Sequence, residues 1–364
     1  MFMSLQSLVC IALCLAAAAP KTEIVEKKYA NGALKLRTEV LLDERGKSVQ
    51  HGKQTKYYPN GQPSLEERFV NNQKDGPWTS WFENGTKSAE GNYQKDLKHG
   101  LEVHYLADGT KFLETNFQNG LKHGKRIDWT GGDHKTREAD YENGRLHGTV
   151  AEWHADGQQT LLEHYEQGEK HGLAQSWNAA GKLHREVSYV HGHKDGVYHE
   201  WFPSGEPKAT MNFRAGKREG KATELFPDGN VRLEGEFSNG DPHGMSRGWF
   251  EDGAKAFELT FEHGRMEGPQ NYWYPNGEKK AEFICHQGYR NGPFTQWYDT
   301  GQRSGAGQYV DGKADGEFKF WYDDGKPQST KLYRKGEKFG TWIQWGTDGQ
   351  KVSEVTYRNG VPLE

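Results

Sequence analysis

Histidine is the side chain in this sequence whose chemistry and spacing first suggest a metal or catalytic site. Six histidines precede a glycine of one regular series: His51, His99, His123, His147, His171 and His243. A zinc site needs ligand nitrogens about 2 Å from one ion, but equivalent positions of neighbouring two-stranded repeats lie about 9.5 Å apart. We therefore expect no metal site, but turn residues that hydrogen-bond locally. The alternative is a histidine row that titrates near pH 6 and tunes partner binding.

Acidic residues recur ten positions before the same glycines: Glu66, Glu90, Glu114, Glu138, Glu186, Glu234, Glu258, Glu282 and Glu354. A glycosidase needs two unequal carboxyl groups in a pocket, whereas these form one row, which predicts a solvated face paired with lysines. The sequence has no HExxH, P-loop or CxxC motif. It thus predicts no catalytic, cofactor-binding or metal-binding residues and a protein that is not an enzyme.

The glycine series itself has a strict period of 24 residues. It consists of Gly52, Gly76, Gly100, Gly124, Gly148, Gly172, Gly196, Gly220, Gly244, Gly268, Gly292, Gly316 and Gly340. We call these the anchor glycines and number other positions relative to them, so that Trp81 is at +5 of Gly76. Further glycines recur at −4 and +9. A fixed period of this length indicates a repeat architecture.

Aromatic residues form two more rows in this frame. From Phe69 onward position −7 is aromatic except at Cys285, and position +5 holds ten of the 12 tryptophans: Trp81, Trp129, Trp153, Trp177, Trp201, Trp249, Trp273, Trp297, Trp321 and Trp345. We expect these tryptophans to be structural, forming an apolar spine shared by stacked units. Exposed rings that bind sugars or choline groups are the alternative. Trp78, Tyr198 and Trp342 fall outside this row and are candidates for exposed contacts.

The segments between glycines have the length and composition of strands. They are about six to nine residues long, rich in aromatic, Thr and Val residues, and bounded by Asn-Gly or Asp-Gly pairs whose residues tolerate positive φ. A compact globule is disfavoured by a mean hydropathy of −1.00. The sequence predicts an all-β fold, an elongated single antiparallel sheet of stacked two-stranded hairpins with about 13 repeats of 24 residues. At about 9.5 Å per repeat the sheet would be a rod on the order of 125 Å long.

The chain divides into three predicted parts. Residues 1–18 resemble a signal peptide, since an apolar run ends in a row of alanines. Its roughly 15 apolar residues are too few to cross a bilayer, so we expect export and no transmembrane span in the mature chain. Residues 19–50 form an atypical N-terminal capping repeat, and residues 51–364 form the repeat array. The lipoprotein alternative rests on Cys10 and Cys14 within the apolar run.

Charge and cysteine content restrict the partners and the stabilising bonds. The formal net charge is −4, with 47 basic and 51 acidic residues spread evenly. No basic stripe predicts nucleic-acid binding, and no polybasic cluster predicts an anionic membrane surface. After signal cleavage Cys285 is the only cysteine, so no intrachain disulfide forms, and its aromatic position predicts a buried, small apolar residue.

The unit Tyr/Phe-x-x-Gly-x-x-x-Gly-x-x-x-x-Trp-Tyr/Phe-x-Asn/Asp-Gly resembles the bacterial variant of the MORN repeat, with residues 269–278 a clear instance. The resemblance covers residues 51–364 and implies an elongated sheet that contacts a protein or a membrane surface, with no catalytic residues. Such proteins are often labelled YwqK-type antitoxins. The prediction is a non-enzymatic rod-like scaffold that binds a protein or cell-envelope partner in the bacterial periplasm, on the outer surface or outside the cell. The alternatives are an antitoxin that neutralises a cognate toxin and a carbohydrate- or choline-binding cell-wall protein.

Overall fold

The computed structural model describes residues 22–43 and 45–363, and the predicted signal peptide lies outside this range. All regular structure in the described residues is β-strand, arranged in one antiparallel sheet of 34 strands. This confirms the predicted fold class. No helix in the described part of the chain is long and apolar enough to cross a membrane. The chain divides into two compact units, Met1–Arg145 and Leu146–Glu364.

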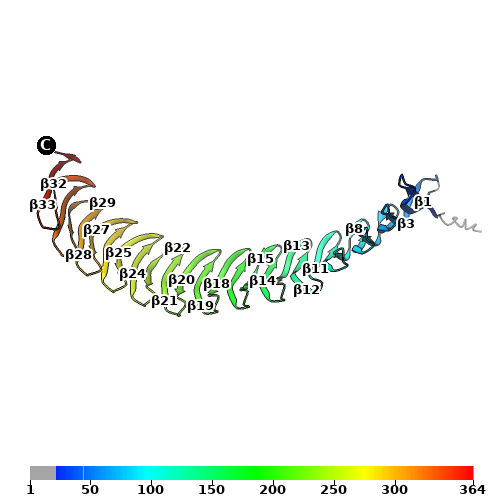
Figure 1. Ribbon diagram of the computed structural model, residues 1–364, viewed down its shortest axis with the longest axis horizontal. Helices are drawn as coiled ribbons and strands as arrows, with labels where there is room; N and C mark the ends of the chain where they lie inside the picture. The colour runs from blue at the N-terminus through cyan, green and yellow to red at the C-terminus, as the bar shows by residue number, and fades with distance from the viewer. Residues whose placement is uncertain (1–21, 44, 364) are drawn as a thin grey trace, which may run out of the picture. The chain divides into compact units, whose positions relative to one another are not determined.

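The first unit holds twelve strands among its described residues, and neighbours in the chain run side by side (Figure 1). They are β1 (Thr22–Lys28), β2 (Leu34–Leu42), β3 (Ser48–Tyr57), β4 (Pro63–Val70), β5 (Gln73–Lys74), β6 (Gly76–Trp81), β7 (Lys87–Gln94), β8 (Leu97–Lys98), β9 (Gly100–Tyr105), β10 (Lys111–Gln118), β11 (Leu121–Thr130) and β12 (His134–Glu142).

The second unit continues the same alternation of strands. They are β13 (Arg145–Trp153), β14 (Gln159–Glu166), β15 (Glu169–Lys170), β16 (Gly172–Trp177), β17 (Leu183–Val190), β18 (His193–Trp201), β19 (Pro207–Arg214), β20 (Lys217–Leu225), β21 (Val231–Ser238), β22 (Asp241–Pro242), β23 (Gly244–Trp249), β24 (Lys255–Glu262), β25 (Arg265–Trp273), β26 (Lys279–His286), β27 (Tyr289–Trp297), β28 (Arg303–Val310), β29 (Lys313–Ala314), β30 (Gly316–Trp321), β31 (Pro327–Arg334), β32 (Glu337–Trp345), β33 (Lys351–Arg358) and β34 (Val361–Pro362).

Each anchor glycine is opposite position −7 of the next repeat across the strand pair, which is aromatic except for Cys285 opposite Gly268. Gly76 is opposite Tyr93 in β6–β7, and Gly196 is opposite Phe213 in β18–β19. The φ of Gly196 is 107°, in a region that strains any residue with a Cβ. The glycines therefore recur every 24 residues because the backbone at these positions has a conformation that strains other residues.

Two kinds of turn alternate along the chain. At positions −5 and −4 both residues have positive φ, for example Asn119 (50°) and Gly120 (82°), which is the pattern of a type I′ hairpin turn. At +8 and +9 only the glycine does. Gly85 has φ 85°, whereas the Oδ1 of Asn84 accepts the Thr86 amide at 3.0 Å. The sequence-based reason given for the Asx-Gly pairs at +8 and +9 was thus wrong, because their Asn or Asp acts as a hydrogen-bonding turn residue.

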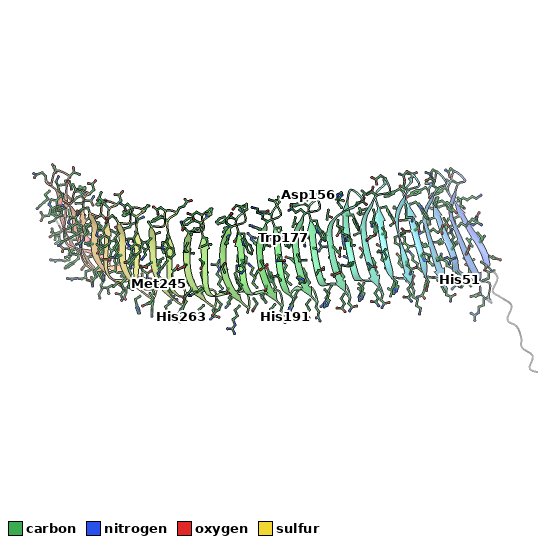
Figure 2. All side chains as sticks on the ribbon, turned by 90° about the horizontal axis from the view of Figure 1, so that it is seen from below. His51, Asp156, Trp177, His191, Met245 and His263 are labelled. Atoms are coloured by element: carbon green, nitrogen blue, oxygen red, sulfur yellow. The ribbon has the colours of Figure 1, made fainter. Side chains whose placement is uncertain are left out.

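The two turn types lie at opposite ends of the strands, so that each type forms a row along one long side, or edge, of the sheet. Figure 2 shows Asp156 at one edge and His191 and His263, both at −5, at the other. Side chains connect successive repeats along these edges: Asn84 Nδ2 donates to the Ala107 carbonyl (3.1 Å), and the Tyr298 hydroxyl donates to the Trp321 carbonyl (2.9 Å). Stacking is thus reinforced by bonds between equivalent turns.

The buried side chains lie mainly on one face of the sheet, which we call the packed face. It carries position +2 and its cross-strand partner at −9 of the next repeat, as in the pair Tyr198–Met211. Most buried residues occupy these two positions: Gln54, Glu67, Glu102, Thr115, Ala139, Val150, Glu163, Ala174, Val187, Tyr198, Met211, Ala222, Gln270, Phe294 and Phe318. Cys285 is also buried, as predicted, and burial raises the pKa of its thiol.

The ten tryptophans at +5 are half-buried. They lie on the face opposite to the packed face, where Trp201 contacts His199 with ring centroids 5.7 Å apart. The buried core is therefore built at +2 and −9, positions to which the sequence analysis assigned no core role. The signal was present in the sequence as the alternation of residues around each anchor glycine.

Candidate binding surface

A row of cations runs along the packed face at position −2, each above the aromatic ring at −7 of the next repeat. Lys74 Nζ lies 5.0 Å from the Tyr93 ring centroid, and Lys194 Nζ lies 4.9 Å from that of Phe213. The guanidinium of Arg218 lies 5.1 Å from the Phe237 ring. Such contacts stabilise the cation without neutralising its charge.

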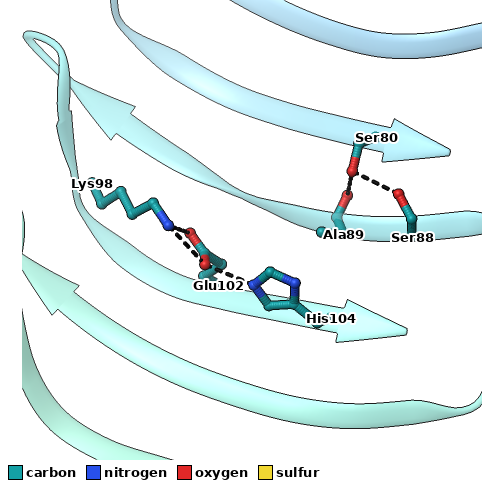
Figure 3. Close-up of polar contacts among 6 residues, drawn as sticks. All are labelled: Ser80, Ser88, Ala89, Lys98, Glu102 and His104. Carbon is teal, nitrogen blue, oxygen red and sulfur yellow. Dashed lines mark hydrogen bonds and ion pairs between the residues drawn. The ribbon is translucent and has the colours of Figure 1, made fainter. Parts of the chain in front are cut away.

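In several repeats a glutamate on the same face neutralises this cation. Lys74 Nζ lies 2.6 Å from Glu67 Oε2, and Lys98 Nζ lies 2.6 Å from Glu102 Oε2. Glu102 also contacts His104 Nε2 at 2.7 Å (Figure 3). The two carboxylates are buried, with side chains only 3% and 7% exposed. A buried carboxylate needs such partners, because an unpaired charge is costly to desolvate.

A hollow of about 570 Å³ opens on the packed face between β18 and β21. Its lining includes Tyr198, Ala209, Met211 and Phe213, with four cations: Lys194, Lys208, Arg218 and Arg232. Its two carboxylates are already engaged, Glu200 by Lys208 (3.0 Å) and Glu224 by Arg232 (3.4 Å). The hollow combines apolar surface with an excess of positive charge.

Lys194 and Arg218 are the cations of this hollow that have no carboxylate within ion-pair distance in the described residues. Both flank Phe213, since Lys194 covers its ring and Arg218 is its cross-strand partner. Burial lowers the pKa of the Lys194 ammonium, and the charges of Arg185 and Arg218 lower it further. The local field therefore favours an added anion.

The opposite face carries the predicted acidic row, and its pairing with lysines is confirmed for seven of the nine glutamates, Glu186 and Glu234 being the exceptions. Lys87 and Glu90 are 2.8 Å apart, Lys111 and Glu114 2.8 Å, and Lys255 and Glu258 2.8 Å. Lysine ammonium groups also cover the tryptophans of this face, as in Lys111 at 4.2 Å from the Trp129 centroid. Much of this face is therefore a solvated lattice of paired charges.

In five repeats the side chain before the anchor glycine accepts a hydrogen bond from the next repeat, whereas Nδ1 of His51, His99, His123 and His171 has no hydrogen-bond partner within the described part of the chain. The Oδ2 atom of Asp195 accepts the Ala215 amide at 3.0 Å, and Glu219 accepts the Asn239 amide at 2.9 Å. His147 occupies the same position and its Nδ1 accepts the Gln167 amide at 3.4 Å. The acceptor thus caps the type I′ turn of the next repeat. In the described residues no three His, Cys, Asp or Glu side chains gather as a metal site.

The three candidates for exposed contacts all lie at +2 of the packed face. Tyr198 is 8% exposed and donates to Glu200 (3.0 Å), so the expectation that it is exposed was wrong. Burial and Glu200 raise its pKa to about 12. Trp78 is half-buried against Tyr93, and Trp342 is half-buried with Nε1 donating to the Leu332 carbonyl at 2.9 Å.

Four segments match the family model of the MORN repeat variant: residues 50–71, 74–95, 170–191 and 314–335. The resemblance to this repeat is therefore confirmed for those segments, and the repeat fold is compatible with protein binding. No curated protein matches the sequence.

Among solved structures, the chain is similar to a crystal structure of TcdB2-TccC3-Cdc42, with 11% identity over 92% of this chain and 22% of that chain, at a TM-score of 0.15. It is also similar to the Tc holotoxin pore of Photorhabdus luminescens, with 10% identity over 90% of this chain and 23% of that chain, at a TM-score of 0.15. The chain spans less than a quarter of the length of those chains, and likenesses at this level carry no functional argument.

Proposed function

We propose that this chain is a non-enzymatic repeat scaffold that binds a protein partner through the packed face between β18 and β21. The hollow carries this proposal, because it combines an apolar lining with two cations, Lys194 and Arg218, that form no ion pair in the described residues. Interaction surfaces are enriched in aromatic and arginine side chains with few acidic ones. The absence of HExxH, P-loop and CxxC motifs from the sequence supports binding without catalysis. The one GxSxG match, residues 244–248, lies within strand β23 and not on the strand-to-helix turn of a nucleophile elbow.

The proposal includes export, as the signal-like residues 1–18 predict. Expression of the full chain in a bacterial host, followed by mass spectrometry of the mature N-terminus, tests this part. We expect a chain that begins at Ala19 in the envelope or outside the cell. An unprocessed chain in the cytoplasm would remove the export step and leave the binding surface untested.

The binding proposal is tested by site-specific photo-crosslinking in the native cell. A photoreactive residue replaces Phe202, which lines the hollow, or Thr210, which is exposed on the opposite face. We expect one dominant protein adduct from position 202 and none from position 210. Equal adducts from both positions, or none from either, contradict the proposal. Recovery of polysaccharide with the chain would favour the carbohydrate-binding alternative.

A further inference from the structure

We propose that the hollow between β18 and β21 binds an acidic, partly apolar segment of the partner protein, with a Glu or Asp carboxylate held by Lys194 and Arg218. This inference rests on the proposed scaffold function and adds the chemistry of the partner. The segment would lie across the packed face, next to Phe213 and Met211.

The other repeats show which anion the cation at −2 takes. Lys74 and Lys170 each bind the glutamate at −9 of their own repeat, Glu67 and Glu163. Lys98 binds the glutamate at +2, Glu102. In three repeats, the cation at position −2 thus binds a carboxylate of the same chain.

In the hollow the same carboxylates are missing. The −9 positions belonging to Lys194 and Arg218 are Val187 and Met211, which are 6% and 8% exposed. The +2 positions are Tyr198 and Ala222. Lys194 and Arg218 thus have apolar or aromatic residues at the two positions that supply a glutamate in those three repeats. An external carboxylate would complete the arrangement that Glu67 completes for Lys74.

The apolar part of the ligand follows from the rest of the lining. Ala209, Met211, Phe213 and Phe226 border the hollow. Its volume of about 570 Å³ is within the range of about 300–1,000 Å³ that is typical of ligand pockets. A carboxylate alone would leave this volume unfilled, so we expect an aromatic or aliphatic side chain beside the acidic residue.

Fluorescently labelled peptides provide the test on the full-length protein. The probes are a Gly/Ser-flanked Glu-Phe-Glu peptide, its neutral Gln-Phe-Gln counterpart and a Glu-Gly-Glu peptide without the aromatic ring. We expect the first to bind at least about tenfold more tightly than the neutral peptide, since Gln forms no charge-assisted hydrogen bond with the two cations. It should also bind more tightly than the peptide without the ring, which buries less apolar surface. Equal affinity for the neutral peptide would overturn the inference. Inorganic phosphate is the competitor, and binding of phosphate without binding of Glu-Phe-Glu would also overturn it.

Matched variants locate the site. Lys194→Gln combined with Arg218→Gln should weaken Glu-Phe-Glu binding at least about tenfold. Lys221→Gln removes a charge from an exposed neighbour on the opposite face and should leave the affinity unchanged. Met211→Glu supplies an internal carboxylate and should abolish binding. Because Met211 is buried, the result for this variant is interpreted only if its circular dichroism spectrum is unchanged. If the spectrum changes, the double Gln variant alone tests the inference.

The crosslinking experiment separates the two proposals. If the Lys194→Gln, Arg218→Gln protein still gives the adduct from position 202, the scaffold function stands and the acidic-segment inference falls. If the chain with the photoreactive residue at position 202, but without the two Gln substitutions, gives no adduct, the scaffold proposal is contradicted, whatever the result of the peptide binding.

Discussion

Positions +2 and −9 of the repeat hold buried polar residues in one region of the sheet and buried aromatic residues in another. Between residues 54 and 115 the buried residues at +2 and −9 include Gln54, Glu67, Glu102 and Thr115. Between residues 294 and 357 they include Phe294 and Phe318, which stack edge-to-face with Tyr309 and Tyr333. The strand pairing around them is equivalent in both regions.

The comparison teaches that the backbone frame does not depend on one kind of core. Glycines with positive φ and hydrogen-bonded turns set the geometry, and the packed face then accepts ion pairs or aromatic rings. A third solution lies between them, where Ala174, Val187, Tyr198, Ala209, Met211 and Ala222 form an aliphatic-rich cluster. Small side chains leave space there, and the hollow lies in that region.

The largest effect is expected where the aromatic stack is cut. Phe318→Ala should lower the free energy of unfolding by about 3–5 kcal/mol, because it removes a ring that is 3% exposed and contacts two tyrosines. Guanidinium unfolding followed by tryptophan fluorescence measures it. Glu317→Ala, at the exposed neighbour, is the control and should change stability by less than about 0.5 kcal/mol. Similar losses for both variants would show that the stack contributes little.

Glu67→Ala is the corresponding test of the polar region. It leaves Lys74 and Gln54 without their carboxylate partner and should cost about 2 kcal/mol. Glu66→Ala, on the opposite face, should cost less than about 1 kcal/mol. Urea unfolding compares the two. If Glu67→Ala leaves the free energy of unfolding unchanged, the buried polar residues do not stabilise this region.

Turn capping should stabilise the repeats in which the residue before the anchor glycine accepts a bond from the next repeat. Asp195→Ala removes the acceptor of the Ala215 amide and should cost about 1 kcal/mol. Hydrogen exchange of the Ala215 amide should accelerate, whereas Asp195→Asn keeps an acceptor oxygen and should retain protection. Unchanged exchange in the alanine variant would contradict the capping role.

The smallest expected effect is a change in how the stability of the protein depends on pH. Hydrogen bonds from Lys125 and Lys135 hold the pKa of Glu138 below its usual value of 4.5. A lowered folded-state pKa gives stability that is present above the unfolded pKa and is lost as pH falls through the folded pKa. Glu138→Gln should therefore lose less stability than the unmodified chain between about pH 6 and about pH 3, by less than about 1 kcal/mol. Parallel losses in both proteins would exclude the contribution.

The sequence by itself determined the repeat, the strand and turn order and the charged lattice. These follow from short-range requirements: Gly196 and Gly120 need positive φ, and Lys87 lies three residues from Glu90. The prediction failed for Tyr198 and for the turn acceptors, because their partners belong to other strands or to the next repeat.

Only the tertiary structure decided which face is packed and where its charges remain unpaired. Lys74 and Lys194 have the same place in the repeat, yet one is neutralised by Glu67 and the other faces a hollow. That difference depends on the residues at −9 and +2 on neighbouring strands. Pairing across strands brings together residues that the linear order keeps apart.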